Sequence, residues 1–346
     1  MISKLVDEKA VKRLHELIDR SEKIVITCHI APDGDALGSS LGLARVLSRI
    51  GKEVKVITPD TPPKIFKFLS GYDDIVVFSK YEEFSRKLIM DADLLFALDY
   101  NDPKRIDRLA PYFVSAKAPK VLIDHHLFPA DFTEVKISHP EVSSTSMLIF
   151  RVLCRLELFP MIDKETAACI YTGMMTDTGN FAYNSNDPDL YIVISELLRK
   201  GIDKDKIYRR VFNSSSPSRM RLNAFAVYEK MKIFEDRRTA LVTLTRKELN
   251  RFHYQKGDTE NLVNLPMRIP EIVMSFYLRE ESDYIKVSAR SKGNIPVNKI
   301  CEQFFGGGGH ANAAGGEFHG TMEEAVEKFI SVLDECEHYI ENFKDS

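Results

Sequence analysis

Short runs of apolar, mostly β-branched residues recur through the first 124 residues, separated by stretches with helical spacing or turn residues. The runs lie at 23–28, 54–58, 74–78, 93–99 and 120–124. Runs of this length predict buried strands, since both faces of such a strand pack against other elements. Their alternation with helical segments predicts βαβ units, and therefore an α/β fold with a mostly parallel sheet flanked by helices.

The chain has 346 residues, about twice the size of a typical single domain, so two domains are expected. We predict a first domain over 1–185 and a smaller α/β domain over 223–346. The plainest break in composition, SSSPS at 214–218, places the linker between them at 186–222. The second domain is expected to contain strands at 239–245, 271–280 and 284–291 and a helix over about 321–343.

Charge and composition exclude several classes of protein. The 48 basic and 51 acidic residues give a formal net charge of −3, without the basic excess of a protein that holds long nucleic acid. No apolar run approaches the ~18 residues of a membrane span and no signal-peptide pattern is seen, so we expect a cytoplasmic protein with no membrane partner. The five cysteines are scattered without a CxxC pair, which predicts buried thiols rather than disulfides or a thiolate zinc site.

Acidic residues and histidines gather where the predicted strands end. They are His29, Asp33 and Asp35, then Asp99, then Asp124, His125 and His126, and finally Asp177 in a later loop. The carboxyl ends of parallel strands share one edge of a sheet, so these side chains are expected to converge in one crevice. Crowded carboxylates repel each other unless cations are present, and carboxylate mixed with imidazole suits Mn²⁺, Mg²⁺ or Zn²⁺. Each residue alone is explained as well by a turn, a cap or a hydrogen-bonded histidine, but one metal site explains them together.

A glycine run near the C-terminus forms a second candidate site. Consecutive glycines let the backbone approach an anion closely, and a helix beginning near Ala311 would add its N-terminal partial charge. Arg290, at the end of a predicted strand, could make a bidentate contact with phosphate. The candidate substrate contacts are Arg290, Gly307, Gly308, Gly309 and His310. The alternatives are a flexible loop for the glycines and a surface side chain for the arginine.

Together these motifs resemble those of the DHH phosphoesterase superfamily. The resemblance rests on HIAPDGDALGS at 29–39, on Asp99, on the DHH triplet at 124–126 and on Asp177, while GGGGHANAAG at 306–315 resembles the DHHA1 domain. The layout is most similar to the branch of oligoribonucleases, or nanoRNases, that also act as 3′-phosphoadenosine 5′-phosphate phosphatases. It implies a DHH catalytic domain with a two-metal site, followed by a DHHA1-like domain that binds substrate.

The resemblance also implies a role for each residue of the crevice. One divalent ion, with Mn²⁺ preferred over Mg²⁺ and others, would be bound by His29, Asp33 and Asp99. The second would be bound by Asp35, Asp99, His125 and Asp177. Asp124 would orient a histidine and His126 would lie near the scissile phosphate, which makes these two the catalytic candidates. Tyr100 departs from the small residue expected after Asp99 and would reshape the pocket floor.

The expected activity is two-metal hydrolysis of short oligoribonucleotides to mononucleotides. The substrate would be short single-stranded RNA or a nucleotide, and a homodimer is considered. Alternatives are dephosphorylation of 3′-phosphoadenosine 5′-phosphate, hydrolysis of a linear or cyclic dinucleotide, polyphosphate hydrolysis, or a non-catalytic nucleotide-binding module. Phe304 and Phe305 are candidates for stacking on a base, with burial in the core as the alternative. An oxidoreductase is excluded because no GxGxxG follows the first strand.

Overall fold

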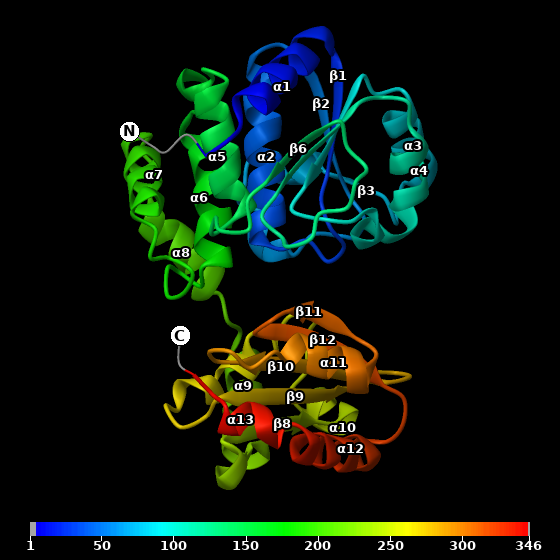
Figure 1. The fold of residues 1–346 in the computed structure, drawn as a ribbon, viewed down its shortest axis with the longest axis vertical. Coiled ribbons are helices and arrows are strands. Elements are labelled where there is room, and N and C mark those ends of the chain that lie inside the picture. The colour runs from blue at the N-terminus through cyan, green and yellow to red at the C-terminus, as the bar shows by residue number, and fades with distance from the viewer. Residues whose placement is uncertain (1–4, 345–346) are drawn as a thin grey trace. The chain divides into compact units, whose positions relative to one another are not determined.

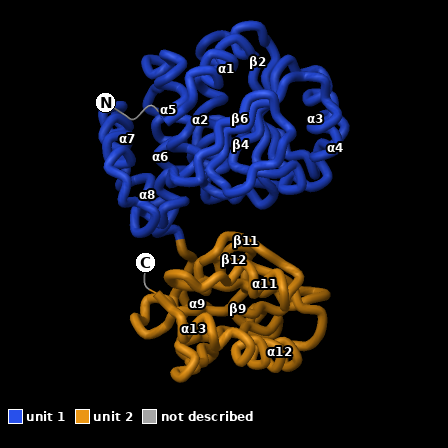
Figure 2. Tube along the Cα trace, in the orientation of Figure 1, with its two compact units in different colours: residues 1–214 blue, residues 215–346 orange. Residues whose placement is uncertain are grey.

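The computed structural model describes residues 5–344 and divides the chain into two compact units between Ser214 and Ser215 (Figure 2). Each unit has its own sheet and its own hydrophobic core. Across residues 5–344, no helix is both long enough and apolar enough to cross a membrane.

Unit 1 contains a six-stranded sheet in which every neighbouring pair is parallel, in the order β3-β2-β1-β4-β5-β6. Its strands are β1 (Lys23–Thr27), β2 (Glu53–Thr58), β3 (Val76–Val77), β4 (Leu94–Leu98), β5 (Lys120–Asp124) and β6 (Val135–Ser138). Five of them match the predicted runs, and the α/β prediction with a parallel sheet is confirmed. β6 was not predicted.

Helices cover both faces of this sheet. Successive residues of each strand point to opposite faces, so both faces carry apolar side chains that need a helical layer. Ile24 and Ile26 of β1 join the core under one helical layer, whereas Val25 joins the core on the other face. The first layer contains α1 (Glu8–Arg20), α2 (Gly34–Arg49), α5 (Thr145–Arg155), α6 (Lys164–Asp177), α7 (Pro188–Arg199) and α8 (Lys204–Phe212) (Figure 1). The second contains α3 (Glu82–Met90) and α4 (Ala110–Ser115).

Helices α2 and α6 pack unusually closely, and glycines make this possible. A Cβ built on Gly38 would lie 2.5 Å from the Cys169 carbonyl oxygen and 2.9 Å from the Gly173 nitrogen. At the far end of the interface, Arg45 of α2 forms a 2.8 Å ion pair with Asp163, the N-cap of α6. The two helices therefore run side by side as one block, with Asp35 near the start of α2 and the end of α6 at the same end.

Unit 2 contains a mixed six-stranded sheet in the order β11-β12-β10-β9-β8-β7, in which only the β8–β9 pair is parallel. Its strands are β7 (Lys232–Phe234), β8 (Thr239–Leu244), β9 (Met274–Glu280), β10 (Ile285–Ser291), β11 (Gly308–His310) and β12 (Ala313–Phe318). One face is covered by α11 (Val297–Phe305) and α12 (Met322–Glu335), with the short α13 (Glu337–Glu341) following. The other is covered by α9 (Pro217–Phe225) and α10 (Arg246–Arg251).

Three local predictions need correction. Residues 186–222 are not an irregular linker, because α7 and α8 lie there and Leu190, Val193 and Leu197 of α7 are fully buried. The break in composition marks only the boundary at Ser214. No helix begins near Ala311, which instead lies in the two-residue turn between β11 and β12. The final predicted helix is divided into α12 and α13 at Cys336.

Candidate active site

The loop after β1 places two of the candidate ligands. The Asp33 side chain caps α2, where its Oδ1 accepts hydrogen bonds from the backbone N–H groups of Asp35 (2.9 Å) and Ala36 (3.0 Å). His29 is buried, and its Nδ1 lies 2.7 Å from the Ile30 carbonyl oxygen. That contact turns the His29 Nε2 towards Asp33 Oδ1, at 3.8 Å.

Asp99 lies at the centre of the cluster, directly after β4. It is 2% exposed and has a φ of 63°, a left-handed conformation that costs a non-glycine residue free energy. Its Oδ2 lies 3.4 Å from His29 Nε2, and its Oδ1 lies 3.7 Å from His125 Nε2. The Thr145 hydroxyl donates a 3.0 Å hydrogen bond to Oδ1. Asp99 therefore faces histidines from two different strand ends.

Asp35 is held by the N-terminus of α5. Its Oδ2 accepts a 2.7 Å hydrogen bond from the Thr145 N–H, and its Oδ1 accepts a 2.9 Å bond from the Ser146 N–H. Ser144 caps the same helix through its hydroxyl, which accepts from the Met147 N–H at 3.1 Å. The first N–H groups of a helix have no partner within it, so the buried Asp35 carboxylate gains partners that are fixed in space.

His125 and Asp177 complete the cluster. The Nδ1 of His125 lies 3.1 Å from the Val142 carbonyl oxygen, and its Nε2 lies 3.4 Å from Asp177 Oδ2. Asp177 is the last residue of α6, the helix locked against α2. Groups of residues whose ligand atoms lie within 4.8 Å of one another are His29, Asp33 and Asp99; Asp35, His125 and Asp177; and Asp99, His125 and His126.

His126 is bound to a different partner. Its Nδ1 lies 2.7 Å from Asp124 Oδ1, and its backbone N–H donates to Asp124 Oδ2 at 3.1 Å. Asp124 is fully buried at the end of β5. Because Asp124 already engages Nδ1, the atom of His126 that faces Asp99 at 3.8 Å, we do not count His126 among the metal ligands. The arrangement is that of a carboxylate that orients an imidazole.

The electrostatics of the cluster favour bound cations. Burial raises the pKa of Asp35 well above its usual range, and the charges of Asp99 and Asp177 add to the effect. Burial, with the charge of Asp99, also raises the pKa of Asp177 to about 7. For His29 burial opposes protonation, but nearby carboxylates, Asp99 first, outweigh it and raise the pKa to about 9. The pKa of His125 rises to about 9 in the same way, through Asp177 and then Asp99. The cluster thus needs positive charge among its carboxylates.

The chemistry of the donor set fits divalent metal ions. Both His29 and His125 direct Nδ1 at a backbone carbonyl, which fixes the Nδ1–H tautomer and leaves the Nε2 lone pair facing carboxylate oxygens. A lone pair facing carboxylates is repelled unless a proton or a cation stands between them. Donation from the second ring nitrogen to a carbonyl is the usual support of a metal-bound histidine.

The predicted substrate contacts lie together within unit 2. Arg290 of β10 and His310 of β11 are both in register with Ala313 of β12, which lies between them. Gly309 lets β11 approach β12 closely, since a Cβ on Gly309 would lie 2.5 Å from the Ala313 carbonyl oxygen. Gly308 differs, because a Cβ there would meet no atom within 4 Å.

Two aromatic predictions can now be judged. Tyr100 does not form a pocket floor: it is fully buried, its hydroxyl lies 2.8 Å from Thr27 Oγ1, and its ring stacks on Phe132. Phe305 is 2% exposed and Phe304 packs against the same core, so the structure supports the core alternative for both.

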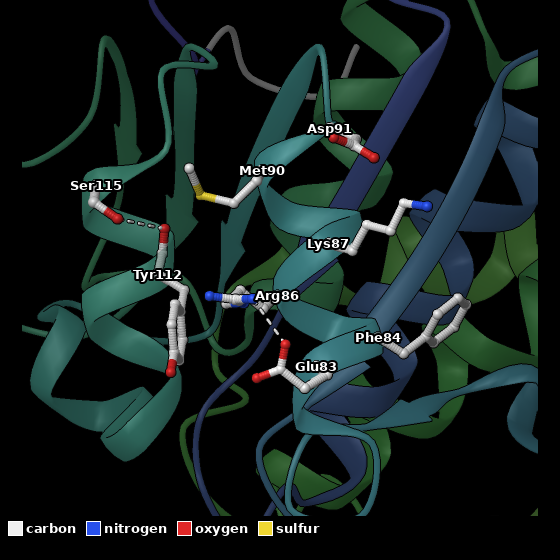
Figure 3. A pocket seen from close by; sticks show the side chains of 8 residues that line it. All are labelled: Glu83, Phe84, Arg86, Lys87, Met90, Asp91, Tyr112 and Ser115. Atoms are coloured by element: carbon white, nitrogen blue, oxygen red, sulfur yellow. Dashed lines mark hydrogen bonds and ion pairs between the residues drawn. The ribbon is translucent and has the colours of Figure 1, made fainter.

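A surface depression of about 620 Å³ lies away from this cluster, between α3 and α4 (Figure 3). Its lining residues are Glu83, Phe84, Arg86, Lys87, Met90, Asp91, Tyr112 and Ser115. None of them belongs to the three groups of candidate ligands. The depression is therefore not the candidate active site.

Sequence reasoning missed the residues that position the ligands. The glycines at the α2–α6 interface recur every four residues in Gly34-Asp-Ala-Leu-Gly38-Ser-Ser-Leu-Gly42, and that spacing was a usable signal. Gly173 on α6 was not recognisable in this way, although a Cβ there would lie 2.7 Å from Asp35 Oδ1. For the start of α5 the sequence predicts mainly a helix cap in Ser143-Ser144-Thr145, and Ser144 is that cap; the bonds from the Thr145 and Ser146 amides to Asp35 depend on tertiary packing.

Comparisons with known proteins identify the family. The N-terminal domain model of the DHH family matches residues 23–174, and the DHHA1 domain model matches residues 241–338. A bifunctional oligoribonuclease and PAP phosphatase NrnA of Thermus thermophilus is 30% identical over 313 residues, which cover 90% of this chain and 89% of that protein. This chain belongs to the DHH family.

Two further relatives of the DHH chain are similar over most of their length. The probable bifunctional oligoribonuclease and PAP phosphatase NrnA of Streptococcus mutans is 26% identical and covers 91% of this chain. An exopolyphosphatase-related protein from Bacteroides fragilis is 48% identical in sequence to this chain. Its crystal structure matches with a TM-score of 0.97 and covers 98% of this chain and 99% of that one. The protein is accordingly a hydrolase that acts on phosphoester bonds, and it carries acidic and histidine clusters that could bind the divalent metals used by DHH phosphoesterases.

Proposed function

We propose that this DHH protein hydrolyses short oligoribonucleotides to mononucleotides with two bound divalent metal ions, Mn²⁺ in preference to Mg²⁺. The observation that carries the proposal is the pair of ligand groups around Asp99, each with a histidine Nε2 facing carboxylates. The substrate class follows the names of the relatives, which are oligoribonucleases.

The ligand assignment is the one that the resemblance to the DHH family implies, and the candidate groups support it. His29, Asp33 and Asp99 would hold one ion, and Asp35, Asp99, His125 and Asp177 would hold the other. Bound there, the ions would supply Lewis-acid polarisation of the phosphoryl group and activation of the attacking water. The fixed Thr145 and Ser146 amides keep Asp35 in place throughout, so the ligand set needs little reorganisation during the reaction.

Asp124 and His126 provide the acid–base function. Asp124 Oδ1 lies 2.7 Å from His126 Nδ1 and accepts a hydrogen bond from it, which fixes the direction of the ring. With both ring nitrogens protonated, His126 would donate its Nε2 proton to the leaving oxygen of the scissile ester, or would hydrogen-bond the phosphoryl oxygens through Nε2–H. In unit 2, Arg290, His310 and the glycines at 307–309 are the groups we propose for binding substrate phosphate.

The test is release of mononucleotides from a labelled RNA series of two to five nucleotides, with and without Mn²⁺. We expect metal-dependent cleavage by the wild-type protein and loss of at least ~10²-fold in the His125→Ala variant, which removes a metal ligand. A Tyr81→Ala variant, changed at a side chain that is 60% exposed on the start of α3, is the control and should keep wild-type activity. Failure of the metal-loaded wild-type protein to cleave any oligonucleotide would remove the proposal.

A second candidate substrate is 3′-phosphoadenosine 5′-phosphate. It is favoured by the second activity in the names of both NrnA relatives. The ligand groups and the Asp124–His126 pair would act on its 3′-phosphate in the same way. Release of inorganic phosphate from this nucleotide, measured beside the RNA series, ranks the two substrates by kcat/KM.

A further inference from the structure

Exposed apolar side chains stand beside the charged cluster. Leu127 and Phe128 follow His126 directly and are 53% and 87% exposed, and Ile30 follows His29 and is 42% exposed. Large apolar side chains so exposed lose the benefit of burial. These three side chains, here called the apolar rim, lie within two residues of His29 or His126 and so stand beside the charged cluster.

The segment after β4 holds both parts of this rim. The Asn101 side-chain N–H donates to the Leu127 carbonyl oxygen at 2.7 Å, and the Asn101 carbonyl accepts from the Ala130 N–H at 2.8 Å. The Ile30 N–H donates to the Arg105 carbonyl at 2.8 Å. Because β4 lies between β1 and β5 in the sheet, the two loops are fixed on either side of Asp99.

The backbone of Phe128 is held in an unfavourable conformation. Its φ is 57°, in the left-handed region that a bulky residue rarely adopts. The Asn101 hydrogen bonds on both sides of Phe128 maintain this conformation while the ring remains in solvent. Within the described structure the Phe128 side chain is exposed, so its burial does not offset the free-energy cost of this backbone conformation. A strained residue without such compensation is typical of positions that meet a ligand.

We propose that Phe128, flanked by Leu127, is the platform on which a nucleobase of the substrate stacks while the adjacent phosphate lies at the Asp99-centred cluster. The inference rests on the proposed function and sharpens it, because an aromatic platform contributes binding only to a substrate that carries a ring. Nucleotides are thereby preferred over polyphosphate at the same metal-binding groups. Stacking on a single aromatic side chain tolerates every base, which suits an enzyme for mixed short sequences.

The chain contains no tryptophan, so a single substitution creates a specific optical probe. Phe128→Trp in the full-length protein is titrated with adenosine 5′-monophosphate and, separately, with ribose 5-phosphate, which has the phosphate but no base. The matched control is Phe84→Trp, at an aromatic residue of α3 that is 52% exposed (Figure 3). We expect adenosine 5′-monophosphate, but not ribose 5-phosphate, to quench the tryptophan fluorescence of Phe128→Trp in a saturable way. Neither ligand should quench the fluorescence of Phe84→Trp in a saturable way.

Kinetics provide the second arm. Phe128→Ala should raise KM for a diribonucleotide ~10-fold and change kcat less than about 3-fold, because stacking contributes to binding rather than to the chemical step. Phe128→Tyr keeps a ring and should restore the wild-type KM. Wild-type KM in Phe128→Ala, or equal quenching of both tryptophan variants, would overturn the proposal. If the wild-type protein cleaves no diribonucleotide, the proposed function fails, and the nucleotide titration still decides whether a base stacks on residue 128.

Discussion

Replacing Gly38 with alanine adds one methyl group to the interface between α2 and α6. The new Cβ would lie 2.5 Å from the Cys169 carbonyl oxygen, whereas ordinary contacts begin at 3.4 Å, so the helices must separate by about 0.9 Å. The two atoms nearest to this Cβ, the Cys169 carbonyl oxygen and the Gly173 nitrogen, belong to the backbone and cannot rotate away. The separation acts on the active site, because α2 carries Asp35 and α6 ends at Asp177, two members of one ligand group.

The expected loss in activity exceeds the loss in stability. Overpacking typically costs about 1–3 kcal/mol, and replacing a helical glycine with alanine returns about 1 kcal/mol, so the net cost to folding is at most about 2 kcal/mol. A displacement of about 1 Å at reacting groups typically lowers the rate ~10²-fold. We therefore expect Gly38→Ala to fold, with kcat/KM for a diribonucleotide reduced ~10²-fold and weaker Mn²⁺ binding by isothermal titration calorimetry.

Gly42→Ala is the matched control. It adds the same methyl group one turn further along the same face, where the nearest atom is Cγ1 of the Ile170 side chain at 2.9 Å. That side chain can change rotamer, so the variant should retain activity within about 3-fold and have an unchanged or higher Tm. Wild-type kcat/KM and Mn²⁺ affinity in Gly38→Ala would refute the reasoning, as would equal losses in the two variants.

Three further predictions concern proton transfer, stability and metal binding. Asp124→Asn should lower kcat by ~10²-fold or more with little change in Mn²⁺ affinity, because the amide has one acceptor oxygen for the two His126 donors and lacks the charge of the carboxylate; a loss of metal binding in parallel would contradict this assignment. At Asp163 burial opposes ionisation, but hydrogen bonds from Thr166 and Arg45 prevail and lower the pKa to about 2. A depressed pKa stabilises the fold above the unfolded-state value near ~4 and loses that effect as pH falls towards 2, so Asp163→Asn should cost about 1–2 kcal/mol at pH 7 and progressively less below pH 4 in urea unfolding. Mn²⁺ at 100 times its Kd should stabilise the wild-type protein by about 2.7 kcal/mol per independent site, seen as a higher Tm that chelator reverses; an unchanged Tm would contradict a folded-state metal site.

Much of unit 1 could be predicted because its strands are buried on both faces and read as apolar runs. β6 was missed because its four residues alternate between buried and exposed positions at the edge of the sheet. The position of Tyr100 could not be predicted either. Simple alternation along β4 would place it on the face of Leu98, but the left-handed Asp99 reverses the direction and puts Tyr100 in the opposite core.

The convergence of the candidate ligands followed from one property of parallel sheets, that their carboxyl ends meet at a common edge. What the pattern could not supply was the support of each ligand. The amides that bind Asp35 lie 110 residues further along the chain, and the carbonyl that orients His125 belongs to Val142. Such contacts depend on how α5 docks, which local sequence does not encode.

The amides at the start of α5 also determine the charge that an incoming substrate would meet. Four carboxylates in the two ligand groups, those of Asp33, Asp35, Asp99 and Asp177, carry a formal charge of −4, which two divalent cations would balance. The N-terminus of α5 adds a partial charge of roughly +0.5 to that sum. For these groups the balance would then be slightly positive rather than neutral, which favours the approach of a phosphodiester anion, so the same helix end that fixes a ligand also contributes to the field that a substrate would meet.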